Sequence, residues 1–432
     1  MIAMTRLATS LALVLSGACL AQSGMDPNVL TLARIKLKMS ETLTRLPNYT
    51  CTQTIERSTR RAGSRRFQLL DSMRLEVALV EGKELFAWPG ARRFEEREIK
   101  EFAPPGGAIG NGNFGLHARA VFMGRSPVFV FAGVENRDGR AMVRFDYSVA
   151  QVLSGFEVRV GAAKAVVGYH GSFWADEKSH EVARLEVYGD DIPPHLGLKD
   201  VSDTVDYARL RIGESDFLLP VSSEMSMTDI QGNENRNRIH FSGCRHYSGE
   251  SVVSFDEPPP DTPAAPPAAP RVIELPVDLP VSVELITPID SRRMMMGDRV
   301  TAALDKDAKW KGQTVAPRGA VLSGRLTRLE RRTGLSGRSQ VSYFVVGIEF
   351  DTLEFETSRA EFFGSLDEIG PMLVPGTQNE MSRPAVLGRG WSHKPDAGDL
   401  RPGVGQFVVK GDTIRLARGF RMSWRVAERT RR

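Results

Sequence analysis

The sequence has few cysteines and histidines, and it lacks the short motifs that mark common enzymes. It holds three cysteines and seven histidines in 432 residues, too few cysteines for a disulfide-dense scaffold. The nucleophile elbow Gly-x-Ser-x-Gly, the metalloprotease motif His-Glu-x-x-His and the phosphate-binding Gly-x-x-x-x-Gly-Lys-Ser/Thr are all absent. We therefore expect no enzymatic activity and no cofactor.

The chain also lacks a strong charge bias and, after its first residues, a long apolar run. Lys and Arg exceed Asp and Glu by 57 to 53, so nucleic-acid binding is not indicated. No later stretch reaches the roughly 18 apolar residues of a transmembrane helix, so we expect no membrane span in the mature chain. Basic residues gather in two places, which indicates a solvated hairpin tip and a frayed tail, with attraction to anionic lipid head groups as the alternative. They are Arg57, Arg60, Arg61, Arg65 and Arg66, and Arg429, Arg431 and Arg432.

The first 21 residues have the three parts of an export signal. Arg6 is followed by the apolar stretch Leu7–Leu15 and then by small residues. Cys19 and Ala21 supply the small side chains that signal peptidase requires, so we predict cleavage after Ala21 and a periplasmic or secreted protein. The signal peptide is predicted to span residues 1–21.

A competing interpretation makes Cys19 the lipid-modified first residue of a lipoprotein. That modification expects a large aliphatic residue three positions earlier, where the chain has Ser16. We therefore favour the cleaved signal.

Two cysteines remain after cleavage, and an exported chain favours their pairing. A Cys51–Cys244 disulfide would close a loop of roughly 190 residues, for which chain entropy gives at most about 5 kcal/mol. The alternative is a metal site that combines Cys244 with His240 and His246 on one face of a strand. Zinc would need a further ligand, and no second cluster accompanies them, so we predict the disulfide and no metal.

The first domain begins with a helix and continues as strands. Helical spacing of apolar residues predicts a helix over residues 26–46, capped by Asp26 and with Pro27 in its first turn. Short β runs follow, and from Pro127 to Phe255 strands and turns alternate regularly, which indicates an antiparallel meander. One face of this sheet is apolar and needs a cover.

A proline-rich segment divides the chain. Residues 256–270 contain repeated Pro and Ala, and such a segment is extended, roughly 45 Å long, because proline fixes the backbone. We predict domains at residues 22–255 and 271–432, tethered by this linker. The second domain is again rich in strands, with residues 365–405 expected as a long loop that holds Trp391 and His393. The fold class is therefore mostly β, an antiparallel half-barrel with an N-terminal helix followed by a small β-barrel-like domain.

The helix and long meander resemble the periplasmic lipoprotein-carrier superfamily, which includes LolA-like and RseB-like proteins. The residues that carry the resemblance are Gly171–Glu186 and Leu219–Met225. It implies a half-barrel folded over helices, with an apolar cavity for acyl chains or for the lipidated end of a partner. No ligand residue of that family can be placed on this sequence.

The second domain resembles small β domains of conjugation-pore scaffold proteins. The stretches Gly297–Leu304 and Gly312–Leu326 carry this resemblance. A turn at Pro317–Gly319 separates two strands, and Gly324 suits a close backbone approach or a bulge. The resemblance implies a barrel that docks partners or the cell wall.

Aromatic residues crowd the first half of the first domain, where they either line a ligand cavity or fill a core. The candidates for a ligand cavity are Phe86, Trp88, Phe94, Phe102, Phe114, Phe122, Phe129 and Phe131. Our first hypothesis is a non-enzymatic cell-envelope protein that binds a lipid-like or lipoprotein ligand in its first domain.

Two other functions remain open. One is a structural or sensing envelope adaptor that binds another protein and has no ligand cavity. The other is an enzyme of unrecognised type, with His195 or His393 as base. The neighbouring acids Asp190–Asp191 and Glu95–Glu96 are expected to be solvated turn residues, because adjacent strand residues point to opposite faces.

Overall fold

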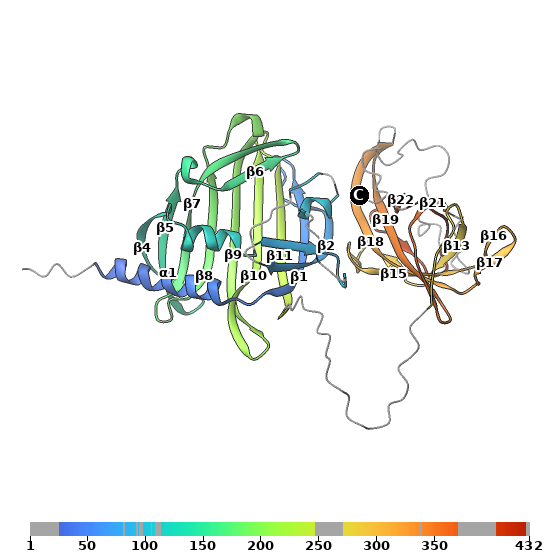
Figure 1. The fold of residues 1–432 in the computed structure, drawn as a ribbon. Coiled ribbons are helices and arrows are strands. Elements are labelled where there is room, and N and C mark those ends of the chain that lie inside the picture. Colours follow the sequence, from blue (N-terminus) through green and yellow to red (C-terminus); the bar gives the residue numbers. More distant parts are fainter. Residues whose placement is uncertain are drawn as a thin grey trace, which may run out of the picture.

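The computed structural model describes residues 26–80, 83–91, 94, 98–104, 106–108, 114–246, 271–336, 339–369 and 403–428. The predicted signal peptide, Cys19 and the linker 256–270 lie outside these residues. The fold is mostly β, as expected, with two large sheets, one from each half of the chain, that are antiparallel except for the parallel pair β12–β20 (Figure 1). The described part of the chain contains no helix with the length and hydropathy to cross a bilayer.

The N-terminal helix forms where the sequence predicts it. Helix α1 spans Pro27–Arg45, and the Asp26 carboxylate caps it by accepting a hydrogen bond from the Asn28 amide at 2.9 Å. Its buried residues are Ile35, Met39 and Leu43, at helical spacing. The helix lies across one face of the first sheet (Figure 1), which we call the inner face.

The first sheet has the strand order β3-β2-β1-β11-β10-β9-β8-β7-β5-β4, with β6 paired to β7 at the side. The meander is confirmed from β7 to β11, and its last strand lies beside β1. The bounds are β1 Tyr49–Arg60, β2 Gln68–Val80, β3 Lys83–Ala87, β4 Val128–Arg137, β5 Arg140–Val149, β6 Phe156–Val160, β7 Ala163–Asp176, β8 Val182–Asp190, β9 Leu198–Ile212, β10 Ser215–Asp229 and β11 Glu234–His246. Short helical turns occupy Ile99–Glu101, Leu116–Ala118, Arg119–Met123 (η2), Gln151–Leu153 and Pro194–Leu196.

A bulge in β10 lies opposite the middle of β9, where the alternation of apolar residues changes. Tyr207 pairs with Pro220 but Asp206 pairs with Ser222, so one residue of β10 is extra. The pairing shifts between Asp206 and Tyr207, close to the point where the apolar positions of β9 change from Val205 and Tyr207 to Leu210 and Ile212.

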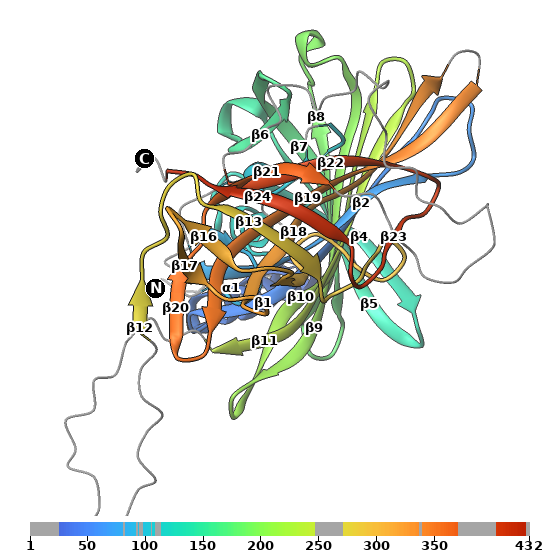
Figure 2. The ribbon, with the colours of Figure 1, turned by 90° about the vertical axis from the view of Figure 1, so that its right-hand side faces the viewer.

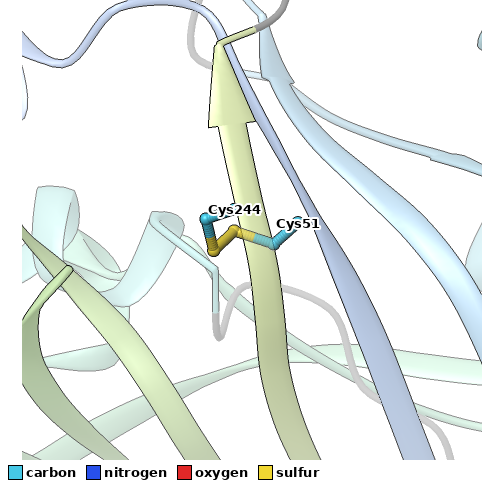
Figure 3. The surroundings of a disulfide bond; sticks show 2 residues. All are labelled: Cys51 and Cys244. Carbon is cyan, nitrogen blue, oxygen red and sulfur yellow. A yellow bond between two sulfur atoms is a disulfide. The ribbon is translucent and has the colours of Figure 1, made fainter. Parts of the chain in front are cut away.

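The pairing of β1 with β11 joins the two ends of the first domain. Cys51 of β1 and Cys244 of β11 form a disulfide across this pair (Figure 3). The predicted disulfide is confirmed, and because it engages Cys244 it leaves no thiolate there for a metal.

The second sheet has the order β12-β20-β19-β18-β15-β13-β24-β21, with β22 also paired to β19. Its core includes Trp424, whose side chain is fully buried. The bounds are β12 Arg271–Ile273, β13 Pro280–Leu285, β14 Ile289–Asp290, β15 Arg299–Leu304, β16 Ala308–Trp310, β17 Gln313–Ala316, β18 Val321–Ser336, β19 Ser339–Phe355, β20 Ser358–Glu361, β21 Gly364–Ile369, β22 Val404–Lys410, β23 Arg415–Leu416 and β24 Arg421–Val426.

Gly324 in β18 is needed for close approach of the neighbouring backbone, as the sequence predicts. A Cβ at this position would lie 2.0 Å from the carbonyl oxygen of Glu349, beside a bulge in the β18–β19 pair. The long loop expected at residues 365–405 is wrong at both ends. Residues 364–369 and 404–410 are strands, because each finds a sheet partner in β24 or β19.

The two large sheets are in contact, a point that the sequence leaves open. β3 pairs with the edge of β2 from Glu76 onwards. The second sheet contacts the same edge of β2 at residues 72–74, before β3 begins. There the Arg74 amide donates to the Met296 carbonyl at 2.8 Å, and the Met296 amide donates to the Ser72 carbonyl at 3.0 Å. The Arg74 guanidinium pairs with Asp298 at 2.5 Å. Figure 2 shows the second sheet in front of the first along this contact.

Gly297 makes this contact possible. Its φ is +95°, and a Cβ there would lie 2.3 Å from the Arg74 carbonyl oxygen. Apolar side chains of both sheets then form one continuous buried cluster around the contact.

Removing the disulfide is expected to destabilise the first domain. The double variant Cys51→Ser/Cys244→Ser should lose about 2–5 kcal/mol of unfolding free energy, since the open chain gains conformational freedom when unfolded. Urea denaturation followed by intrinsic fluorescence measures this loss. Reduced wild-type protein should match the variant, and equal stability of oxidised wild type and variant would contradict the assignment.

Gly297→Ala is expected to release the second domain from β2. Gly319→Ala is the matched control, because Gly319 also has a positive φ of +87° but no atom lies near its Cβ position. Both variants carry the backbone cost of about 1 kcal/mol, and the clash adds to it at Gly297 alone. Hydrogen exchange of the Arg74 and Met296 amides should speed up in Gly297→Ala and stay slow in Gly319→Ala. Equal exchange rates of these amides in the two variants would contradict this account of the contact.

Candidate functional site

Aromatic rings on the inner face form a seam that starts at the sheet edge. Phe131 of β4 is partly exposed, and its ring lies 5.3 Å from that of Phe145 on β5. Phe145 stacks on Phe173 of β7 at 5.5 Å, and Phe122 of η2 contacts Phe173 edge-on at 5.0 Å. Phe129 packs on the same ring at 6.1 Å. These contacts occur because alternate residues of β4, β5 and β7 point to the same side of the sheet.

The seam continues inward through tyrosines. Tyr147 and Tyr169 are 6.2 Å apart, and Phe156 follows at 5.9 Å from Tyr169. Gly171 leaves room for Tyr147, whose hydroxyl donates to the Glu186 carbonyl at 2.7 Å, because a Cβ on Gly171 would lie 2.7 Å from that hydroxyl. The aromatic contacts therefore extend from solvent at β4 into the interior.

A buried His–Asp pair lies at the inner end of the seam. The His117 ring is 5.7 Å from that of Phe156, and its Nε2 lies 3.1 Å from Asp203 Oδ2 of β9. The side chains are 13% and 4% exposed. Burial opposes the charge on His117, but the hydrogen bond and the negative charge of Asp203 outweigh it and raise the pKa of His117. Burial also opposes the charge on Asp203 and so raises its pKa, and His117 partly offsets this.

Several buried polar atoms of the first sheet lack hydrogen-bond partners among the described residues. They are Asp203 Oδ1, both amide atoms of Asn237, Gln53 Oε1 and the Tyr49 hydroxyl. Asp203 and Asn237 flank Met225 in one row across β9, β10 and β11. An unpaired buried polar group costs about 1–3 kcal/mol, so these atoms mark places where water or a polar ligand group would be held.

Arg57 closes the other end of this row. It pairs with Asn237 across β11 and with Asp71 across β2. Its guanidinium binds the Asp71 carboxylate at 2.8 and 2.6 Å and donates to the carbonyls of Gly106 and Pro104. Arg57 is thus buried, and its expected place on a solvated hairpin tip is wrong. Its position two residues after Ile55 puts it on the inner face.

Seven of the eight aromatic candidates divide between two clusters. Phe86, Trp88, Phe102 and Phe114 are buried in the core around β1, β2 and β3, where Trp88 contacts Phe102 edge-on at 5.1 Å. Phe122 and Phe129 belong to the seam, as does Phe131. Phe94 is half-buried. A role of these residues in lining a ligand cavity stays a prediction.

The other predicted residues are dispersed. His195 is exposed, and its Nε2 lies 3.5 Å from the Lys164 carbonyl. Asp190 accepts a hydrogen bond from the exposed His170 at 2.7 Å. Glu95, Glu96, Trp391 and His393 lie outside the described residues.

Two hollows open on the outer face of the first sheet, opposite α1. The larger, about 530 Å³, is lined by hydroxyl and charged side chains of β1 and β8–β11. The smaller, about 400 Å³, lies beside β4 and has Val128 and Val130 on one wall. Neither includes the aromatic candidates.

Sequence reasoning missed His117, Asp203 and most of the seam. The alternation Val143, Phe145, Tyr147, Val149 is a clear strand signal that could have identified the β5 part. His117 and Asp203 are 86 positions apart, and no local pattern connects them.

Comparisons with known proteins find only weakly similar solved structures. No protein-family model matches the chain, and no curated protein is similar to it in sequence. A DUF1329 family protein from Desulfovibrio piger is 13% identical with a TM-score of 0.30, covering 54% of this chain and 98% of its own. A putative outer membrane lipoprotein-sorting protein domain from Vibrio parahaemolyticus is 14% identical with a TM-score of 0.29, covering 52% and 94%. A LolA superfamily protein from Nitrosomonas europaea is 13% identical with a TM-score of 0.26, covering 50% and 94%.

These neighbours include the superfamily that the first domain was expected to resemble. Identities and scores of this size carry no argument about what the chain binds. The expected resemblance of the second domain to pore-scaffold β domains stays a prediction.

The His117–Asp203 pair is expected to make stability depend on pH. Because the folded-state pKa of His117 is raised, the folded protein binds more protons than the unfolded chain at and above pH ~6.5. The stabilisation is fully present below that pH and is lost as pH rises through the folded pKa. Urea denaturation across this range should show wild type losing stability.

His117→Gln should remove that contribution, while His195→Gln, at an exposed histidine, should keep it. If His117→Gln shows the same pH slope as wild type, the pair does not titrate as described.

Proposed function

We propose that the protein is an exported, non-enzymatic binding protein of the cell envelope whose first domain takes a lipid-like or lipoprotein ligand. The observation that carries the proposal is the aromatic seam from Phe131 at the sheet edge to the buried pair His117–Asp203. An acyl chain along this seam would exchange water for aromatic contacts, at about 0.8 kcal/mol for each CH₂ group.

Helix α1 covers the inner face of the first sheet, and it is the element that would move to admit a ligand to the seam. Its buried side chains are Ile35, Met39 and Leu43, and each contributes about 1.5–3 kcal/mol by burial. Lys38 ties the helix to the β7–β8 turn through the Ser179 carbonyl at 2.9 Å and Glu181 at 3.2 Å. A chain of ten or so CH₂ groups offers burial of the same size, so it could replace the helix on the rings.

The polar end of the seam suits a ligand with a head group that donates a hydrogen bond. Asp203 Oδ1 is buried and lacks a partner among the described residues. A hydroxyl, amide or ammonium group of the ligand would satisfy this oxygen and recover the cost of leaving it unpaired.

The disulfide supports an oxidising compartment for the mature protein. The predicted signal at residues 1–21 would take the chain there. In this proposal the second domain, residues 271–432, fixes the protein to a partner or to the cell wall.

A fluorescent fatty alcohol tests the proposal. Delipidated protein should enhance the emission of cis-parinaryl alcohol, and Phe145→Leu should weaken binding by about tenfold because a seam ring is lost. Phe102→Leu is the matched control, since Phe102 and Phe145 are both 2% exposed but Phe102 belongs to the other cluster. The control should bind as wild type does. No binding by wild type, or equal loss in both variants, would refute the proposal.

A further inference from the structure

Two neighbouring turns of the first sheet form a paired tip. The β1–β2 turn and the β10–β11 turn lie side by side because β1 pairs with β11 along its length. The Ala62 amide donates a hydrogen bond to the side-chain oxygen of Asn233 at 3.1 Å, which joins the two turns directly. In Figure 2 the blue β1–β2 hairpin extends outward from the first sheet. We call residues 60–67 and 229–236 the arginine tip.

The arginine tip carries an excess of positive charge. It contains five arginines and two acidic residues. Both acids are already engaged, because Glu234 pairs with Arg60 and the Asp229 carboxylate accepts hydrogen bonds within its own turn. Three further arginines are exposed, and their guanidinium groups make no hydrogen bond or ion pair with the residues that the structure describes. They are Arg61, Arg65 and Arg66.

A stack of arginine and aromatic side chains holds the base of the tip. The guanidinium carbons of Arg60 and Arg236 lie 4.8 and 3.6 Å from the centre of the Phe67 ring. Such cation–π contacts are favourable, and here they fix the end of the β1–β2 turn to β11. The three unpaired arginines are therefore presented on a fixed support.

Apolar side chains are exposed beside these charges. Ile230 follows Asp229 in the β10–β11 turn and is 67% exposed, while its amide donates to the Gly197 carbonyl at 3.0 Å. Leu69, just beyond the tip in β2, is 49% exposed. Cations beside exposed apolar groups are typical of surfaces that enter the interface of an anionic bilayer, where the charges meet lipid phosphates and the apolar groups reach the acyl boundary.

The size of the arginine tip disfavours a protein partner. A stable protein interface takes about 800 Å² and roughly 20–30 residues from each side, whereas the tip consists of two short turns with their strand ends. Neither of the two hollows on the outer face includes a residue of the tip, so neither would seat a partner's side chain there. A bilayer requires no groove, because the side chains of the tip enter it.

We propose that the arginine tip docks the protein onto an anionic phospholipid bilayer. Arg61, Arg65 and Arg66 bind lipid phosphates, which the planar guanidinium fork matches in geometry. Ile230 inserts among the head groups and loses its contact with water. This proposal is independent of ligand binding beneath α1, since no residue of the aromatic seam belongs to the tip.

Vesicle sedimentation tests this proposal on the mature, disulfide-bonded protein. Vesicles that mix phosphatidylglycerol with phosphatidylcholine should bind the protein. Vesicles of phosphatidylcholine alone should bind it at least about tenfold more weakly, because they offer no net negative charge. High salt should release the protein from the mixed vesicles by screening the arginines.

The triple variant Arg61→Gln/Arg65→Gln/Arg66→Gln should bind the mixed vesicles at least about tenfold more weakly than wild type. Its matched control removes the same charge from exposed lysines around β16 in the second domain. That control is Lys306→Gln/Lys309→Gln/Lys311→Gln, and it should bind as wild type does.

Ile230→Ser tests the apolar part of the contact and should weaken binding by about fivefold or more. Val272→Ser is its control, at a 77% exposed valine of β12, and should have no effect. Equal binding to neutral and mixed vesicles, equal loss in the two triple variants, or full binding by Ile230→Ser would overturn the proposal. Polyglutamate bound as tightly as the mixed vesicles would overturn it in favour of an acidic polypeptide.

Discussion

The pairing of β1 with β11 is the contact on which the rest of the structure depends. Strand β1 has twelve residues and β11 has thirteen, and they come from opposite ends of the first domain. The Cys51–Cys244 disulfide links the two strands. β1 positions β2, and the free edge of β2 holds Met296 of the second domain. The loss of this pairing would separate three strands from the meander and take the docking edge with them. The disulfide thus supports a long-range contact that is slow to form by chance.

The inner face of the first sheet has two halves that differ in their side chains. Around β4, β5 and β7 the rings of the seam contact one another. Towards β1 and β2 the face carries the buried Arg57–Asp71 pair and is filled by its own core. The row from Asp203 of β9 to Arg57 of β1 runs across the strands between these halves. A ligand beneath α1 would therefore meet aromatic surface first and polar groups last.

The sequence predicts local features and misses the long-range ones. The Asp26 cap, the meander and the cysteine pair follow from spacing and residue type, and the structure confirms them. Arg57 was assigned to a turn by its charge, although its alternation with Ile55 points inward. His117 with Asp203, and Gly297 against Arg74, join residues that are far apart in sequence. Such pairs depend on how the sheets assemble, which no window of residues contains.

The central claim is that the aromatic seam receives an acyl chain beneath α1. A crystal structure of the protein with bound dodecan-1-ol tests this most directly. We predict electron density for the chain between α1 and the rings of Phe145 and Phe173, with the ligand hydroxyl donating to Asp203 and the Phe122–Phe173 contact broken. The account is contradicted if the seam rings keep their mutual contacts while the alcohol binds elsewhere or is absent.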